Sequence, residues 1–183
     1  MILNDRIEVK KKLLEGINLV ANTVKPTLGP QAKTVILQGN PPVIINDGVT
    51  ITKYISHDDP YIQMGIQLVQ NLASKAQDNS GDGTTTACIL AQAFCNNLVD
   101  FGEDMSIHEF NVLISELRDI MISHLDNHVV EVENDDILNV ATIAANNDRH
   151  LGSLIKGAID EVGRDGIITV EESNNYNTEI EIR

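Results

Sequence analysis

A short glycine- and threonine-rich stretch constrains the fold more than any other feature, because it lies between two long runs of helical periodicity. It reads Gly81-Asp82-Gly83-Thr84-Thr85-Thr86. Glycines let the backbone turn sharply and approach a ligand closely. The N-terminus of the helix that follows offers free N–H groups and a positive dipole end to an anion. This layout is typical of a phosphate-binding loop, and an ordinary glycine-rich turn before a threonine-capped helix is the alternative.

The acidic residue of this stretch, Asp82, bears on what would bind there. A bare carboxylate repels phosphate, so an aspartate beside a phosphate loop makes sense if a divalent cation lies between them. Mg²⁺ is usually held by one or two carboxylates together with substrate phosphates. The stretch therefore predicts a Mg-nucleotide site. The site is not of the Walker type, because the chain has no Gly-x-x-x-x-Gly-Lys-Ser/Thr pattern.

Composition narrows the class of protein. The 183 residues are enough for one large or two small domains, and aromatic residues make up only 3%, which favours aliphatic helical packing. A net charge of -14 disfavours nucleic acid and anionic membranes as partners. No signal peptide and no membrane-length apolar run is visible.

Cys88 and Cys95 are about two helical turns apart, too far for a disulfide, and are predicted to be reduced core thiols.

Periodicity predicts the order of the elements along the chain. Expected helices cover residues 5–24, 49–55, 60–77, 84–101, 106–127, 135–146 and 149–162. A hairpin is expected from strands 34–38 and 43–46, and two further strands at 167–170 and 179–182. The expected inward faces of the fourth and fifth helices are Ala87, Leu90, Ala91, Phe94, Leu98 and Phe101, and Ile107, Phe110, Leu113, Ile114, Leu117, Ile120, Met121 and Leu125.

Capping signals mark several helix ends. Ser106 and Glu109 form a capping box, Asp148 suits an N-cap and Gly163 suits a C-cap. The histidines of the fifth helix and its end share no tight ligand geometry and are interpreted as surface or helix-end residues; they are His108, His124 and His128.

Two other short stretches could belong to the same site as the glycine-rich loop. Thr27-Leu28-Gly29-Pro30 follows the end of the first helix, and it is either a plain turn or a second phosphate contact. Asp47-Gly48 follows the second strand. Asp47 could simply cap the next helix, which is the common role of an aspartate there. Alternatively it is a second carboxylate beside the nucleotide.

Several stretches, taken together and in order, resemble one protein family. They are Thr27–Pro30, Asn46–Val49, Gly81–Ala87, Ile143–Asp148 and Val162–Glu171. Between about residues 3 and 182 the chain resembles the N-terminal part of a group I chaperonin subunit, the GroEL family. The Gly-Asp-Gly-Thr-Thr-Thr and Thr-Leu-Gly-Pro motifs are specific in combination, whereas either alone would not be.

The resemblance implies a mainly α fold with two parts. Residues 1–128 would be the N-terminal, ATP-binding half of an equatorial domain, a helical bundle with a small β-hairpin. Residues 129–183 would be the first segment of an intermediate domain, a small α/β segment that ends where an apical domain begins. The apical domain, the returning intermediate segment and the other equatorial half are expected outside this sequence.

The resemblance also implies the site residues and cofactors. ATP and Mg²⁺ are implied, with K⁺ as a further candidate cofactor. Asp82 matches the magnesium-binding aspartate, and Asp47 matches a carboxylate near the γ-phosphate that supports hydrolysis, which favours the site role of Asp47 over capping alone. The implied nucleotide-binding residues are Thr27, Leu28, Gly29, Pro30, Asp47, Gly48, Asp82, Gly83, Thr84, Thr85 and Thr86.

Enzymatic activity of this chain stays open, because the family's main catalytic aspartate lies in the returning intermediate segment. Asn46 also stands where the family usually has a lysine, so a positive charge near the phosphates is absent. The isolated chain is therefore expected to bind nucleotide weakly, to hydrolyse it negligibly and to be poorly stable alone.

The resemblance implies a homo-oligomeric ring that folds unfolded substrate proteins with a co-chaperonin, both bound by the apical domain. Neither nucleic acid nor membrane is an expected partner. The expected location is the cytoplasm of a bacterium or of a virus-infected host, or an organellar matrix or stroma. The alternative is a naturally short, non-catalytic chaperonin-like protein that associates with full-length rings or modulates them. A small stand-alone kinase or ATPase is disfavoured by the absence of a Walker lysine.

Overall fold

The structure is a computed structural model that describes residues 6–29, 31–39, 41–98, 105–171, 178, 180 and 181. Within these residues, no helix combines the length and apolar character needed to cross a bilayer. The chain divides into two compact units, residues 1–115 and 116–183. Their boundary falls inside helix α5 (Ile107–Asp126). The domain boundary that the sequence suggests, between residues 128 and 129, stays a prediction.

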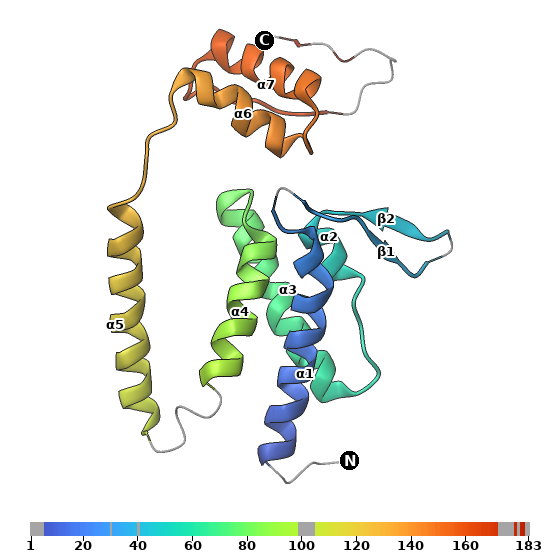
Figure 1. The fold of residues 1–183 in the computed structure, drawn as a ribbon, viewed down its shortest axis with the longest axis vertical. Helices are drawn as coiled ribbons and strands as arrows, with labels where there is room; N and C mark the ends of the chain where they lie inside the picture. Colours follow the sequence, from blue (N-terminus) through green and yellow to red (C-terminus); the bar gives the residue numbers. More distant parts are fainter. Residues whose placement is uncertain are drawn as a thin grey trace. The chain divides into compact units, whose positions relative to one another are not determined.

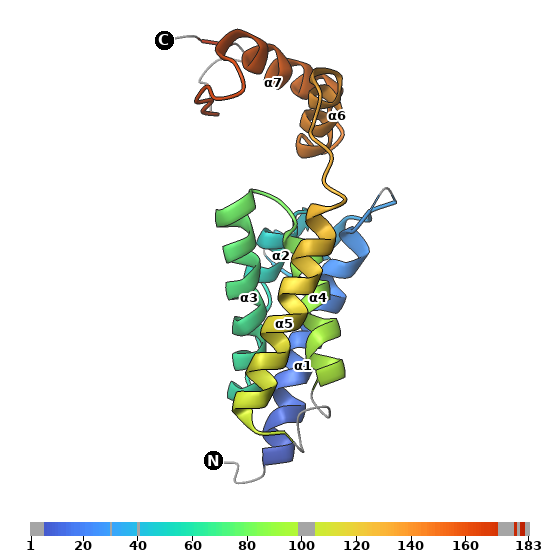
Figure 2. The same ribbon diagram turned by 90° about the vertical axis from the view of Figure 1, so that its left-hand side faces the viewer.

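The first unit is a small helical bundle with a β-hairpin (Figure 1). Three long helices pack side by side in both views (Figure 2), and α1 makes the most extensive contact with α3. The mainly α prediction with a small hairpin is confirmed. The elements are α1 (Arg6–Val24), η1 (Lys25–Thr27), β1 (Val35–Leu37), β2 (Val43–Ile45), α2 (Gly48–Lys53), α3 (Pro60–Ser80) and α4 (Thr84–Leu98).

Aliphatic side chains form the core of this unit, as the scarcity of aromatic residues predicts. Val20, Ile51 and Ile66 are completely buried. Burial of a side chain of this size contributes about 1.5–3 kcal/mol relative to its exposure to water. Periodicity predicts an inward stripe on the third helix at Ile62, Ile66, Val69, Leu72, Ala73 and Ala76. Four of these residues are buried, whereas Leu72 is 38% exposed.

The hairpin connects the end of α1 to α2. β1 and β2 are antiparallel, with Val35 opposite Ile45 and Leu37 opposite Val43. Leu37 is buried against the helical core, whereas Ile36 is exposed on the other face. Period-2 alternation therefore anchors one face of the hairpin to the bundle. This anchoring fixes where the following residues, Asn46 to Gly48, enter α2.

Two glycines allow α1 and α3 to approach more closely than side chains would permit. A Cβ atom built on Gly16 would lie 2.1 Å from the carbonyl oxygen of Ile62, and one built on Gly65 would lie 2.1 Å from that of Leu13. Both obstacles are backbone atoms, which cannot move aside. At Gly16 and Gly65 the backbones of the two helices are therefore in direct contact. The sequence interpretation missed this feature.

The predicted inward face of the fourth helix is correct only in part: Ala87, Ala91 and Leu98 are half-buried. Leu90 is 48% exposed and Phe94 is 37% exposed, whereas Cys88 is completely buried. Cys95 packs against the same core, and both cysteines are free thiols as predicted. The helix contacts α1 through polar side chains, since Gln92 Nε2 donates to the side-chain oxygens of Asn18 (2.8 Å) and Asn22 (3.0 Å). Residues 99–104 lie outside the described residues; they include the predicted Phe101 and Gly102, which by sequence suits the C-cap of this helix.

Helix α5 likewise differs from the prediction in burial, although not in its position. The capping box forms: the Glu109 N–H donates to Ser106 Oγ (3.2 Å), and the Ser106 N–H donates to Glu109 Oε2 (3.0 Å). None of the helix's residues is buried, and Ile120 and Leu125 are 66% and 61% exposed. Periodicity defines an apolar stripe but not what packs on it.

The second unit contains a pair of packed helices, α6 (Asn134–Ala144) and α7 (Arg149–Val162). Asp148 caps α7 by accepting from the N–H groups of His150 and Leu151, and Gly163 ends it with φ 81°, both as predicted. The predicted strand 167–170 is wrong: Ile167 and Val170 are 91% and 89% exposed, and that segment has no regular structure. A strand needs a partner ladder, and two of the four residues of the predicted second strand, 179–182, lie outside the described residues.

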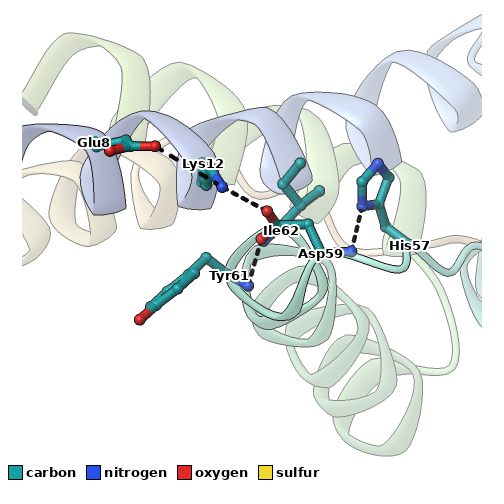
Figure 3. A network of polar contacts seen from close by, with 6 residues as sticks. All are labelled: Glu8, Lys12, His57, Asp59, Tyr61 and Ile62. Atoms are coloured by element: carbon teal, nitrogen blue, oxygen red, sulfur yellow. Dashed lines mark hydrogen bonds and ion pairs between the residues drawn. The ribbon is translucent and has the colours of Figure 1, made fainter. Parts of the chain in front are cut away.

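An ion pair joins α1 to the start of α3 (Figure 3). Lys12 Nζ lies 2.5 Å from Asp59 Oδ2, and the other carboxylate oxygen accepts from the N–H groups of Tyr61 and Ile62. Asp59 thus caps α3 and binds a lysine at once. The hydrogen bond from Lys12 lowers the pKa of Asp59, and the same bond raises the pKa of Lys12.

We expect Asp59→Asn to destabilise the protein at neutral pH and to have a smaller effect in acid. The folded-state pKa of Asp59 is below its ordinary value of 3.8, so its contribution is complete above that value and is lost as the pH falls through the folded pKa. Asparagine still caps a helix, so the substitution isolates the ion pair. Urea midpoints at about pH 7 and about pH 3 measure the difference. The control is Asp58→Asn, at an exposed neighbour; a pH-independent effect of Asp59→Asn would contradict the expectation.

Candidate functional site

The glycine-rich stretch forms the bend between α3 and α4. Gly81 and Gly83 have φ values of 69° and 79°, in the left-handed region that glycine adopts without strain. Gly81 ends α3, and its N–H donates to the carbonyl oxygen of Gln77. The Asp82 side chain lies in solvent, and its Oδ1 accepts from the Gly83 N–H at 2.6 Å. The sequence thus folds into a three-residue turn with an exposed carboxylate.

The three threonines form the first turn of α4 and differ in exposure. Thr84 is buried, Thr85 is half-buried and Thr86 is exposed. The first backbone hydrogen bond of the helix runs from the Ala87 N–H to the Gly83 carbonyl oxygen (2.8 Å). The N–H groups that precede it have no partner within the helix, as at every helix start. The turn therefore presents backbone donors and hydroxyl groups together.

The Thr-Leu-Gly-Pro stretch forms a tight turn after the first helix. The Leu28 N–H donates to the Lys25 carbonyl oxygen (3.3 Å), and Gly29 has φ 84°. The Lys33 N–H donates back to the Pro26 carbonyl oxygen (2.8 Å), which closes the turn. Leu28 and Gly29 are exposed, so their backbone is accessible to a ligand. Pro30 lies outside the described residues.

The two loops, far apart in sequence, meet at their threonines. Thr27 Oγ1 lies 3.5 Å from Thr85 Oγ1. The Thr27 hydroxyl donates its own hydrogen to the Val24 carbonyl oxygen (2.8 Å), so the Thr85 hydroxyl is the donor between the two threonines. The structure therefore brings together two of the three stretches that the sequence assigned to one site.

The third stretch joins them through Gly48. A Cβ atom built there would lie 2.4 Å from Thr85 Oγ1, 2.9 Å from Thr84 Oγ1 and 3.3 Å from the Thr85 backbone nitrogen. Gly48 is buried, and it is the first residue of α2. Only a residue without a side chain lets the start of α2 contact the start of α4 in this way.

Asp47 has a capping role in the structure. Its Oδ2 accepts from the Thr50 N–H at 2.8 Å, which makes it the N-cap of α2. The side chain is exposed. Capping and a position beside a ligand are compatible, because a carboxylate has a second oxygen. The supporting role in hydrolysis stays a prediction.

A residue that the sequence interpretation missed holds α2 in place. Gln70 on α3 donates through Nε2 to the carbonyl oxygens of Thr52 (2.7 Å) and Ile55 (3.1 Å) at the end of α2. The Thr52 carbonyl oxygen also accepts from the Ile55 N–H (3.2 Å), so Gln70 adds a bond that ties this backbone turn to α3. Gln70 thereby positions α2, and with it Asp47 and Gly48. No local signal distinguishes this glutamine from others on the same helix.

The donor set of the site fits a magnesium-bound phosphate chemically. Mg²⁺ is usually bound by one or two carboxylates and phosphate oxygens rather than by a cage of protein ligands. Within the part of the chain that the structure describes, no group of three or more His, Cys, Asp or Glu residues is placed to hold a metal. Asp82 alone could supply the protein ligand, with the N–H groups at the start of α4 and the exposed Thr86 hydroxyl left to donate to phosphate oxygens.

We expect Gly48→Ala to displace the first turn of α4. The new methyl group would overlap the Thr85 hydroxyl, and overpacking of this kind destabilises by about 1–3 kcal/mol. Thr85→Ala removes that oxygen, so the double variant should be less destabilised than the sum of the two single variants. Urea unfolding of all four proteins measures the coupling. Strict additivity would mean that Gly48 and Thr85 do not contact each other in solution.

Comparison with known proteins identifies the class of protein. The model of the TCP-1/cpn60 chaperonin family matches residues 20–181, and the chain belongs to this family. A chaperonin GroEL of Methanospirillum hungatei JF-1 is 42% identical over 172 residues, covering 92% of this chain and 32% of the relative. Chaperonin GroEL 1 of Prochlorococcus marinus strain MIT 9515 is 39% identical over 176 residues, which cover 94% of this chain and 30% of that relative.

These matches confirm the predicted resemblance to group I chaperonins. The chain spans about a third of the length of the two relatives. Solved structures agree on the fold. The chaperonin gp146 from the Pseudomonas aeruginosa bacteriophage EL, crystallised in presence of ATP-BeFx, has a TM-score of 0.75 at 25% identity and covers 92% of this chain and 31% of its own. A group III chaperonin in the open state has a TM-score of 0.70 at 20% identity, and the match covers 89% of this chain and 33% of that chaperonin.

Proposed function

We propose that the chain is the nucleotide-binding part of an ATP-dependent chaperonin subunit. The observation that carries the proposal is the contact of the Thr27 and Thr85 hydroxyl groups, which joins two loops 58 residues apart. Gly48 packs against the same threonines. Three stretches that match the family's motifs thus meet in one place. Family membership supports the chaperone role.

In this proposal the backbone N–H groups of the two loops bind the phosphates, and the exposed Thr86 hydroxyl is a further donor. The start of α4 adds free N–H groups and the positive end of its dipole. Mg²⁺ bound to Asp82 would neutralise phosphate charge and polarise the transferred group. The exposed backbone of Leu28 and Gly29 would offer further contacts to the phosphates. Catalysis of phosphoryl transfer depends mainly on such positioning and charge stabilisation.

The chain's own residues supply part of a hydrolytic site. Asp47 would lie near the γ-phosphate and help to orient the attacking water. The main catalytic aspartate that the family resemblance implies has no counterpart within residues 1–183. We therefore expect the chain by itself to bind Mg-ATP weakly and to hydrolyse it negligibly. Asn46 stands in place of the family's usual lysine, and the loss of this positive charge also lowers the expected affinity for ATP.

The whole-protein role is that of a ring-forming foldase. The proposed partners are further copies of the subunit, unfolded proteins and a co-chaperonin, the last two bound by an apical domain. The proposed location is a cytoplasm or an organellar matrix. Structural neighbours of the chain are themselves chaperonins, which supports the ring.

Equilibrium dialysis with labelled ATP tests the nucleotide proposal directly. We expect saturable binding in the presence of Mg²⁺ that is much weaker when the metal is chelated, with little ADP formed. Adenosine, which lacks phosphates, should not compete. Binding that is independent of Mg²⁺, or competition by adenosine as strong as by ATP, would contradict a phosphate-centred site.

A further inference from the structure

A pair of histidines lies at the end of α5, in the second unit, away from the phosphate loops in sequence. His124 is in the last turn of the helix, which ends at Asp126, and His128 is in the turn that follows. The two ring centroids are 4.4 Å apart, and the ring planes are tilted by 42°. Both residues are exposed. Residues four apart share one face of a helix, and here the pair keeps this relation across the helix end.

One of the rings is oriented by the backbone. His128 Nδ1 lies 2.8 Å from the carbonyl oxygen of His124. A carbonyl oxygen can only accept, so Nδ1 carries the hydrogen in this bond. The lone pair of the neutral ring is then on Nε2, at the far side of the ring. Metal-ligating histidines characteristically donate their other ring N–H to a carbonyl or carboxylate in this way, which fixes tautomer and orientation.

We propose that His124 and His128 form a two-histidine site for a divalent transition metal, such as Zn²⁺ or Ni²⁺. Imidazole nitrogen suits these ions, whereas Mg²⁺ prefers oxygen ligands. The site would thus be chemically distinct from the proposed nucleotide site and does not depend on it. Because no group of three or more candidate ligands occurs within the described ranges, water molecules fill the remaining coordination positions.

Metal binding would act on the end of the helix. It would connect a residue inside α5 with one beyond its last turn, so it requires that the C-terminal turn be formed. A ligand that binds only the folded form stabilises that form by mass action. The site would therefore hold the end of α5 against fraying, at the start of the segment that leads to α6 (Asn134–Ala144).

Titration calorimetry of the full chain with Zn²⁺ or Ni²⁺ alone, without nucleotide, tests the proposal. We expect one site in the wild-type chain, with affinity at least about tenfold lower in His124→Gln and in His128→Gln, since each variant leaves a single imidazole. His108→Gln, which removes an exposed histidine near the other end of the same helix, should bind like the wild type. Circular dichroism verifies that all variants keep their helices.

Other outcomes of the same titrations would contradict the two-histidine site. Wild-type affinity in either His124→Gln or His128→Gln, or no binding by the wild type at about millimolar metal, would overturn the site. An equal loss in His108→Gln would show that binding depends on histidine count and not on the pair. The Mg-ATP measurements are unaffected by any of these outcomes, so the two proposals fail independently.

Discussion

Asp82→Asn is expected to remove the Mg²⁺-dependent part of ATP binding. Asparagine retains an oxygen that can accept from the Gly83 N–H, the 2.6 Å bond that Asp82 makes, so the turn between α3 and α4 should persist. What the variant loses is the negative charge that a hard cation requires. We expect the affinity for Mg-ATP to fall by at least about tenfold, which corresponds to about 1.4 kcal/mol.

A matched control separates a metal ligand from a general effect of charge. Asp78→Asn makes the same change at an exposed position near the end of α3. It should leave Mg-ATP affinity near the wild-type value, because no phosphate loop contains it. Metal-free ATP should bind Asp82→Asn at least as well as it binds the wild type, since the repulsive carboxylate is gone. Equal losses in both variants, or none in Asp82→Asn, would remove Asp82 from the site.

Gly16→Ala is expected to be among the most destabilising single substitutions in the first unit. Its methyl group would lie 2.1 Å from the Ile62 carbonyl oxygen, so α1 and α3 must move apart. Overpacking against side chains costs about 1–3 kcal/mol. Here the obstacle is backbone and cannot rotate away, so we expect the upper part of that range. Gly65→Ala should behave alike, because its methyl group meets the Leu13 carbonyl oxygen.

The control for this pair is Gly157→Ala in α7. Among the residues that the structure describes, a Cβ atom there would meet only Ile180 Cδ1, at 3.7 Å, which is an ordinary contact. Alanine is favoured over glycine in helix interiors by about 1 kcal/mol, so this variant should be neutral or stabilised. Urea unfolding followed by circular dichroism compares the three variants. Stabilisation by Gly16→Ala would mean that the two helices are not in close contact in solution.

Local patterns in the sequence were sufficient for the helices and the hairpin, but not for the predicted strand 167–170. Caps at Ser106 and Asp148 act within a few residues, so short patterns encode them. Burial was harder to predict. The stripe with Leu90 and Phe94 is as periodic as a buried stripe, but α4 packs through its two cysteines and the polar Gln92 instead. Periodicity identifies a face, whereas the choice of partner depends on the rest of the fold.

The same distinction applies to the candidate site. Glycines and threonines in loops indicated phosphate chemistry because the local backbone conformation is part of the motif. Tertiary contacts gave no such signal. The bond from Gln70 to the end of α2 and the Gly16–Gly65 approach each join positions distant in sequence. For Asp47, local sequence favoured a helix cap, whereas the family resemblance favoured a position beside the nucleotide. In the structure Asp47 is a cap, and this role is compatible with a nucleotide next to it.

The most direct test of the central claim, that the two loops bind one nucleotide, is to map ATP on the chain by amide NMR. Titration with Mg-ATP should shift the backbone signals of two segments together, around residues 27–29 and 81–86, with one common dissociation constant. Signals of α6 and α7 should not change. Shifts in only one loop, separate affinities for the two loops, or shifts elsewhere with none at these loops would contradict the account.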